Sequence, residues 1–145
     1  MAEAVAEKKL KLRVIAPTMS TDKSPYKFEK AVDMVIVRCI TGDMGILPGR
    51  VPVSMVLGTG VLRIFDEDSE RHIALVGGVA HVSDDVVTIL SDEAQKPDEI
   101  DVDKVNADLR EFRQMYEQAT DLKEKKKYSD ESHRCQVLLE VAKSK

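Results

Sequence analysis

The sequence has little of what several classes of protein depend on. It contains no Trp, only 4% aromatic residues and a formal net charge of −4, so both base-stacking platforms and the basic excess that neutralises phosphates are missing. No apolar run approaches the roughly 20 residues that a membrane span needs, and residues 1–9 lack the apolar core of a signal peptide. We therefore expect a cytosolic chain with no nucleic-acid partner.

Cysteines and catalytic motifs are equally scarce. The two cysteines, Cys39 and Cys135, lie far apart without framework spacing, which predicts two reduced, buried thiols. The three histidines have no partner at metal-ligand spacing. The chain contains no nucleophile elbow and no Walker loop, and the Gly58-Thr59-Gly60 sequence opens a strand where a dinucleotide site needs a helix. The sequence therefore predicts a protein that is not an enzyme.

Short apolar segments separated by turn residues run from residue 10 to residue 90. Leu10, Leu12 and Val14 alternate with charged residues, which is the period of a half-buried strand. Residues 32–41 form a strand-like run that is apolar on both faces, and residues 17–27 are expected to form a polar loop. The spacing of the strands is typical of an antiparallel sandwich or barrel. Further strands are expected at residues 51–56, 61–65, 72–76, 79–82 and 86–90.

The segment 42–50 is rich in turn residues. It contains Gly42, Gly45, Pro48 and Gly49. Glycine reaches backbone angles that other residues avoid, and proline fixes φ and lacks an N–H donor. We therefore predict a rigid, shaped loop here, which is neither strand nor helix.

The composition changes after Ser91, because the last 48 residues contain neither glycine nor proline. Apolar residues recur there at helical steps, Asp101 is a suitable N-cap, and a basic run covers Lys123–Lys127. The pattern predicts an antiparallel two-helix hairpin with its turn between Asp121 and Ser129. It divides the chain into a β-sandwich domain, residues 1–92, and a helical domain, residues 93–145. The two apolar stripes consist of Val105, Leu109, Phe112, Tyr116 and Ala119, and of Cys135, Leu138, Leu139 and Ala142.

Two motifs carry a family resemblance. Residues 42–50 read Gly-Asp-Met-Gly-Ile-Leu-Pro-Gly-Arg, and the chain continues through Pro52 to Gly-Val-Leu-Arg-Ile at residues 60–64. This order resembles the epsilon subunit of rotary F-type ATP synthases, whose pattern has a histidine where this chain has Arg50. Residues 76–90 resemble a second signature of the same family, a Gly-Gly pair followed by a strand that ends Val-Thr-Ile-Leu.

The resemblance implies a two-sheet β-sandwich followed by two helices, without an active site. Such a subunit sits in the central stalk, binds the gamma subunit and the ring of c subunits, and couples ion translocation to ATP synthesis. It reaches the cytoplasmic face of the cell membrane only through the complex. The helical tail would inhibit ATP hydrolysis by extending toward the alpha and beta subunits. There the basic run could meet acidic surfaces, although a solvated turn explains that run equally well.

The resemblance also implies site residues. The acidic position of the family motif, implicated in contact with the ring, falls at Asp43. The contact surface for ring and gamma would comprise Gly42, Asp43, Met44, Gly45, Ile46, Pro48, Gly49 and Arg50.

Some family members bind ATP in the folded hairpin, and no cofactor is otherwise required. Ile100 and Asp101 match the start of their motif, whereas Lys104 replaces an arginine and loses its planar fork. A regulatory ATP site, with or without Mg²⁺, would comprise Ile100, Asp101, Lys104, Arg110 and Arg134. The alternative is a free-standing nucleotide sensor, a β-sandwich with a helical lid.

Overall fold

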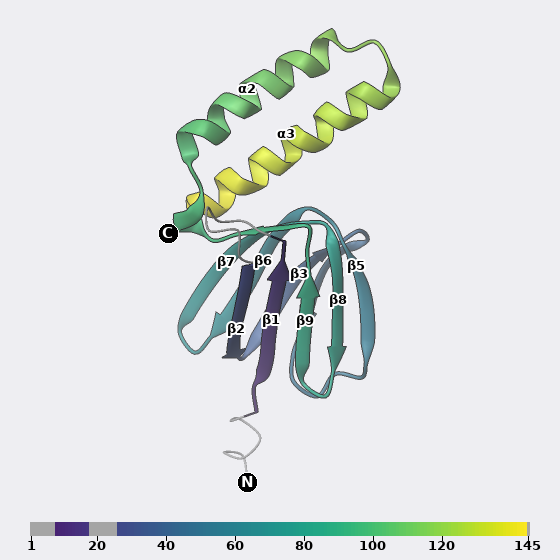
Figure 1. The fold of residues 1–145 in the computed structure, drawn as a ribbon. Coiled ribbons are helices and arrows are strands. Elements are labelled where there is room, and N and C mark those ends of the chain that lie inside the picture. Colours follow the sequence, from purple (N-terminus) through teal and green to yellow (C-terminus); the bar gives the residue numbers. More distant parts are fainter. Residues whose placement is uncertain (1–7, 18–25, 145) are drawn as a thin grey trace.

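The computed structural model describes residues 8–17 and 26–144. Figure 1 shows a two-layered β body with a pair of antiparallel helices at one end, so the predicted sandwich and hairpin are confirmed. The strands are β1 (Leu10–Ala16), β2 (Tyr26–Val32), β3 (Met34–Cys39), β4 (Gly42–Ile46), β5 (Val53–Leu57), β6 (Gly60–Asp66), β7 (Ser69–Val76), β8 (Gly78–Ser83), β9 (Val86–Leu90) and β10 (Glu93–Gln95). The helical elements are the 3₁₀ turn η1 (Pro97–Glu99), α2 (Val102–Gln118) and α3 (Leu122–Ala142).

The strands form one sheet that curls over to make both layers. Its order is β10-β7-β6-β3-β5-β8-β9-β1-β2, with β4 paired to β3 outside this path. The described pairs are antiparallel except that β1 runs parallel to β9. The prediction of an antiparallel sheet is therefore wrong for this one pair, which joins the first strand to a strand that lies far along the chain.

The main core lies between the two layers. Burial alternates along β1, as the period of Leu10, Leu12 and Val14 predicted, because alternate side chains point to opposite faces of a strand. Inward residues from both layers, such as Val35, Ile64 and Ile89, are at most 1% exposed and belong to one apolar cluster. Burial of this cluster gives the β body a core built from strands.

The chain passes from one layer to the other at Gly77 and Gly78. The preceding strand β7 pairs with β6 and β10, whereas the following strand β8 pairs with β5 and β9. Gly78 has φ +113°, and a Cβ atom there would lie 2.0 Å from the Leu90 carbonyl oxygen. Only glycine fits such a position, so the strand break predicted at this pair is confirmed.

Three strand predictions need correction. Residues 42–46 form β4, because Met44 and Ile46 turn inward while Asp43 and Gly45 turn outward, and pairing with β3 outweighs the glycine content. The predicted strand 32–41 is divided at Asp33 into the end of β2 and all of β3. The short strand β10 lies in what was expected to be the helical tail, and it pairs with β7. Most of the predicted loop 17–27 lies outside the described residues.

The helices begin where side chains can cap them. Asp101 accepts a hydrogen bond from the Lys104 amide at 3.2 Å, which confirms the predicted N-cap, and Asp121 accepts one from the Lys123 amide at 3.2 Å. The second cap starts α3 at Leu122, so the prediction of a turn between Asp121 and Ser129 is wrong. The chain turns at residues 119–121, and the basic run lies on the first turns of α3.

The hairpin has an apolar cluster of its own. The cluster joins Val105 and Leu109 of α2 to Cys135, Leu138 and other residues of α3, and it extends to Ala74 on the outer face of β7. Cys135 and Cys39 are both free and buried, as predicted, and burial raises the pKa of each thiol. The helices therefore pack on the outside of the sheet and take no part in the core between its layers.

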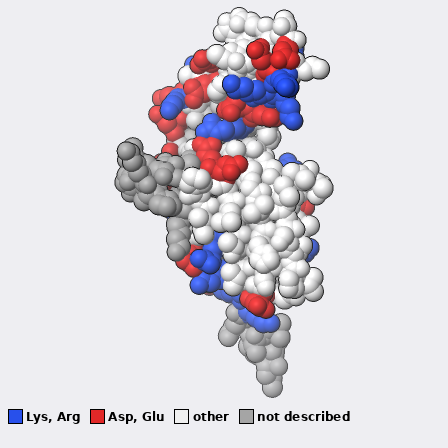
Figure 2. All heavy atoms as spheres, turned by 45° about the vertical axis from the view of Figure 1, so that its right-hand side comes forward, with Lys and Arg blue, Asp and Glu red and all other residues white. Residues whose placement is uncertain are grey.

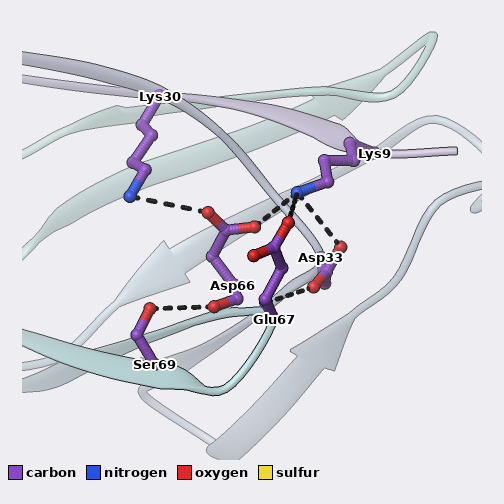
Figure 3. Close-up of polar contacts among 6 residues, drawn as sticks. All are labelled: Lys9, Lys30, Asp33, Asp66, Glu67 and Ser69. Carbon is purple, nitrogen blue, oxygen red and sulfur yellow. Dashed lines mark hydrogen bonds and ion pairs between the residues drawn. The ribbon is translucent and has the colours of Figure 1, made fainter. Parts of the chain in front are cut away.

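A cluster of ion pairs lies on the sheet where β1 begins. Lys9 Nζ lies 2.6 Å from Asp66 Oδ1, 3.7 Å from Asp33 and 4.0 Å from Glu67, and Lys30 Nζ lies 3.5 Å from the other Asp66 oxygen (Figure 3). The hydrogen bond from Lys9 lowers the pKa of Asp66 and raises the pKa of Lys9. The cluster thereby links the start of β1 and the β2–β3 corner to the β6–β7 turn.

We predict that Asp66→Asn changes how the stability of the fold depends on pH in the acidic range. The folded state lowers the pKa of Asp66, so the ionised side chain stabilises the fold at any pH above its unfolded-state pKa of about 3.9. This stabilisation is lost as the pH falls through the folded-state pKa. Asp66→Asn should therefore unfold at a lower urea concentration than the wild type at pH 7, with the difference disappearing in acid. Asp68→Asn, in the same turn, is the control. An unchanged midpoint for Asp66→Asn at pH 7 would contradict the prediction.

Candidate functional site

The outermost strand of its layer, β4, carries most of the residues that the sequence analysis selected. Cys39 pairs with Gly42 at the β3–β4 turn, where Gly42 has φ +129°. The next residue, Asp43, has a side chain that is 61% exposed and lies 3.4 Å from Arg38 on β3. The carboxylate is therefore displayed at the surface with one local partner.

The loop that follows β4 is tied down at two points. The Gly49 amide donates a hydrogen bond of 2.7 Å to Asp85 Oδ1 in the β8–β9 turn, and Gly49 has φ +88°. Arg50 folds back along β4, where its guanidinium lies 3.5 Å from the Gly45 carbonyl oxygen and 3.5 Å from Met44 Sδ. The loop thus holds a cation beside the exposed strand.

The segment 42–50 is divided between surface and core. Asp43, Gly45, Gly49 and Arg50 are exposed, and Gly42, Met44 and Pro48 are half-buried. Ile46 is 0% exposed and belongs to the main cluster. Ile46 therefore anchors the strand and presents no surface to a partner.

An apolar row crosses the outer face of the other layer, and the sequence analysis did not identify it. Val56 on β5 pairs with Val79 on β8, and Val79 pairs with Leu90 on β9. These three side chains are 55%, 46% and 48% exposed. Figure 2, which brings the side of these strands forward, shows a broad face without charged side chains below the charged helices. The signal in the sequence was an apolar residue at an outward position in each of three strands.

Two polar contacts fasten α3 to the sheet beside the apolar cluster. His133 Nε2 donates a hydrogen bond of 3.1 Å to the Thr59 carbonyl oxygen in the β5–β6 turn. Arg134 makes a two-pronged ion pair with Glu93 on β10, and the hydrogen bond to Glu93 raises the pKa of Arg134. The hairpin is consequently held against the sheet in a closed arrangement.

The residues predicted to bind ATP do not converge on one cavity in this arrangement. Ile100 is buried in the second apolar cluster, and Asp101 caps α2. Lys104 and Arg110 are exposed on α2. Arg134 lines a hollow of about 390 Å³ near the β5–β6 turn, together with Asp130 and Glu131, while its guanidinium is engaged by Glu93.

Neither a metal centre nor a membrane span emerges from the described residues. Within residues 8–17 and 26–144, His, Cys, Asp and Glu form no group of three or more that could hold a metal ion. No helix in the described part of the chain is both long enough and apolar enough to cross a membrane.

Comparison with known proteins points to one family. The sequence model described as "ATP synthase, Delta/Epsilon chain, beta-sandwich domain" matches residues 9–97. The ATP synthase epsilon chain of Trichodesmium erythraeum is 36% identical over 136 residues, covering 92% of this chain and 95% of the relative. The epsilon chain of a Synechococcus strain is 39% identical over 72% of each chain. The match to the epsilon chain of Alkalihalophilus pseudofirmus, at 41% identity, covers 55% of this chain and 60% of that relative.

Solved structures agree with the sequence matches. A chain in the mitochondrial ATP synthase of Euglena gracilis superposes with a TM-score of 0.60 at 25% identity, covering 94% of this chain and 81% of that one. A chain in the central stalk and c-ring of the Tetrahymena thermophila mitochondrial enzyme superposes with a TM-score of 0.54 at 17% identity. The superposition covers 93% of this chain and 98% of that one. The second likeness concerns the fold alone.

Proposed function

The chain belongs to the ATP synthase epsilon-chain family as a non-catalytic subunit, and from this premise we propose that it works in the central stalk of a rotary ATP synthase. There its β body would bind the gamma subunit and the c-ring at the cytoplasmic face of the membrane. It would help to couple ion translocation to ATP synthesis, and its helical hairpin would restrain ATP hydrolysis. Membership of this family favours these roles over a free-standing nucleotide sensor.

The observation that carries the inhibitory role is the separation of the two apolar clusters. The hairpin packs through its own cluster on the outer face of β6 and β7, and the core between the layers consists of strand residues. A tail attached in this way can leave the sheet without opening the main core. An extended tail would then reach the alpha and beta subunits, with the basic run of Lys123–Lys127 available for acidic surfaces.

The uncharged face around Val79 is suited to the gamma subunit. Val56, Val79 and Leu90 give a contiguous apolar row on rigid strands, and interface cores are depleted of charge in this way. The β4 edge, with Asp43 and Arg50 exposed, is suited to polar loops of the ring. The two surfaces belong to different layers, so one subunit could hold both partners together.

Regulatory ATP remains a separate proposal. A nucleotide phosphate that bound Arg134 would compete with Glu93, whose carboxylate already accepts hydrogen bonds from Nε and Nη2 of the guanidinium. A phosphate that displaced Glu93 would have to bind Arg134 tightly enough to offset the loss of this ion pair. Calorimetry with ATP, with and without Mg²⁺, tests whether it occurs.

We predict that Val79→Asp weakens binding of the full chain to the gamma subunit at least about tenfold. A charge at the centre of an apolar contact would have to be buried without a partner, and a loss of about 1.4 kcal/mol corresponds to tenfold in affinity. Titration calorimetry with purified gamma subunit measures the change. Leu122→Asp, at the exposed start of α3, places the same charge on the hairpin and should bind like the wild type. Equal affinity for Val79→Asp would refute the assignment of this face.

A further inference from the structure

The curled sheet leaves a gap where its two ends meet. One end of the strand order is β2, and at the other end β10 pairs with β7 only at Ala74, Leu75 and Val76. Among the described residues, no strand therefore pairs with residues 69–73 of β7 on the edge away from β6. A cavity of about 390 Å³ lies at this gap, and its lining includes Phe28 of β2 together with residues of β6 and β7. Its size falls within the range of small-molecule sites, which is about 300–1,000 Å³.

An arginine stands in this cavity at a position where the strand pattern places a core residue. Arg71 pairs with Ile64 across β7 and β6, so both side chains lie on the inner face of the sheet. Ile64 and the next inward residue of β7, Ile73, are buried in the main cluster. Phe28 and Pro97 add further apolar surface to the lining. The guanidinium of Arg71 is thus placed beside the edge of an apolar core.

The charges around the cavity leave a positive excess. The side chain of Arg71 has no hydrogen bond or ion pair within residues 8–17 and 26–144. Lys96 is a second cation in the lining, and His72 is formally neutral. Of the two carboxylates there, Glu70 is already bound by an arginine of β6 at 2.7 Å, which leaves Asp98. Two cations against one carboxylate give a net charge of +1, which matches a monoanion.

This combination fits a molecule with an apolar body and one negative charge. A carboxylate can accept two parallel hydrogen bonds from a guanidinium, and an acyl chain gains by leaving water for apolar surface. A ligand with several phosphates would carry more negative charge than these cations balance. We propose that the cavity binds a medium-chain fatty carboxylate, with Arg71 and Lys96 holding the carboxylate and the acyl chain lying along Phe28 and Pro97.

A ligand in this position bridges the β body and the helical tail. Lys96 and Pro97 belong to the segment that leads into α2, and Ser144 follows α3, where its hydroxyl donates to the Val141 carbonyl oxygen. All three line the cavity together with Arg71 of β7. The ligand therefore binds the closed arrangement and stabilises it by mass action. This binding does not depend on the proposed central-stalk function, so either can fail without the other.

The test is an NMR titration of the isolated full chain with decanoate and, separately, with decylammonium, which has the same chain length and the opposite charge. We expect decanoate alone to cause saturable shifts at the amides of Arg71 and Lys96. Arg71→Gln should bind decanoate about fivefold more weakly, the scale of a partly exposed ion pair. Arg113→Gln, which removes an exposed arginine of α2 outside the cavity, should bind like the wild type.

A second variant and a second readout guard against a merely structural effect. Asp98→Asn removes the opposing carboxylate and should strengthen decanoate binding about twofold, which a loss of folding could not produce. Saturating decanoate should also slow hydrogen exchange of the α3 amides, and unchanged exchange would overturn the bridging of body and tail.

Three results would overturn the site itself. Equal shifts with decanoate and decylammonium would show apolar adsorption without recognition of the anion. Equal affinity of Arg71→Gln and the wild type would remove the arginine from the site. Shifts confined to the apolar row around Val79 would place the ligand on the other layer of the sheet.

Discussion

Deleting residues 97–145 is expected to raise ATP hydrolysis by the assembled enzyme about fivefold or more, which is the scale of a typical coupling free energy between sites. The deletion removes η1, α2 and α3 but keeps β10, whose Ala94 is fully buried in the main cluster. For this reason the cut belongs after Lys96 and not at the boundary of residue 92 that the sequence suggested. Hydrolysis is measured on the enzyme reassembled with either chain.

The control for this deletion is the state of the shortened chain. Removing the hairpin exposes Ala74 and Val61, so the variant has to be shown to retain its sheet by circular dichroism and to bind the gamma subunit. A shortened chain that is folded and bound, yet leaves hydrolysis unchanged, would remove the inhibitory role. It would leave the role of the β body in the stalk intact.

Local periodicity explains what could be predicted of the fold from the sequence. The alternation in β1 and the apolar stripe of α2 are short-range patterns, and each describes one face of one element. One member of the stripe was wrong, since Tyr116 is 40% exposed, whereas Ala119 beyond it is 8% exposed and buried as predicted. The helix turn at residues 119–121 was misplaced because no glycine or proline marks it, and the Asp121 cap that fixes it resembles any other acidic residue of the tail.

Longer-range features could not be derived in this way. The parallel pairing of β1 with β9 joins Leu12 to Val87, and no local pattern specifies the partner of a strand. The glycines of β4 predicted a loop because glycine has a low strand propensity, and the sequence does not show the pairing with β3 that outweighs it. At the site, motif reasoning selected the exposed Asp43 and Arg50, but it also selected Ile46, whose burial follows only from the strand it belongs to.

The role of Arg134 shows most clearly what tertiary structure adds. From the sequence, Arg134 was predicted to bind a nucleotide. In the structure it forms an ion pair with Glu93, 41 residues earlier in the chain. Their side chains are 27% and 18% exposed, and Gln95 Nε2 also donates to Glu93 at 3.1 Å. The pair joins α3 to β10, so it exists only while the hairpin is closed.

We predict that Arg134→Ala shifts the hairpin toward the extended state. Truncation leaves the Glu93 carboxylate largely buried without its cation, which costs about 2 kcal/mol after allowance for partial exposure. That free energy corresponds to a roughly thirtyfold larger extended population. Hydrogen exchange of the α3 amides should accelerate accordingly in the isolated chain, and hydrolysis by the assembled enzyme should fall, which is opposite to the effect of deleting the hairpin.

Arg113→Ala supplies the matched control for this prediction. Arg113 is exposed on α2 and makes no ion pair within the described part of the chain, so its loss removes the same charge without touching the closed contact. If α3 exchanges equally slowly in Arg134→Ala and Arg113→Ala, the Glu93 pair does not hold the hairpin. The apolar cluster around Leu138 and Val141 would then account for the closed state, and Leu138→Ala should open it instead, because removing a buried leucine side chain costs about 2–5 kcal/mol.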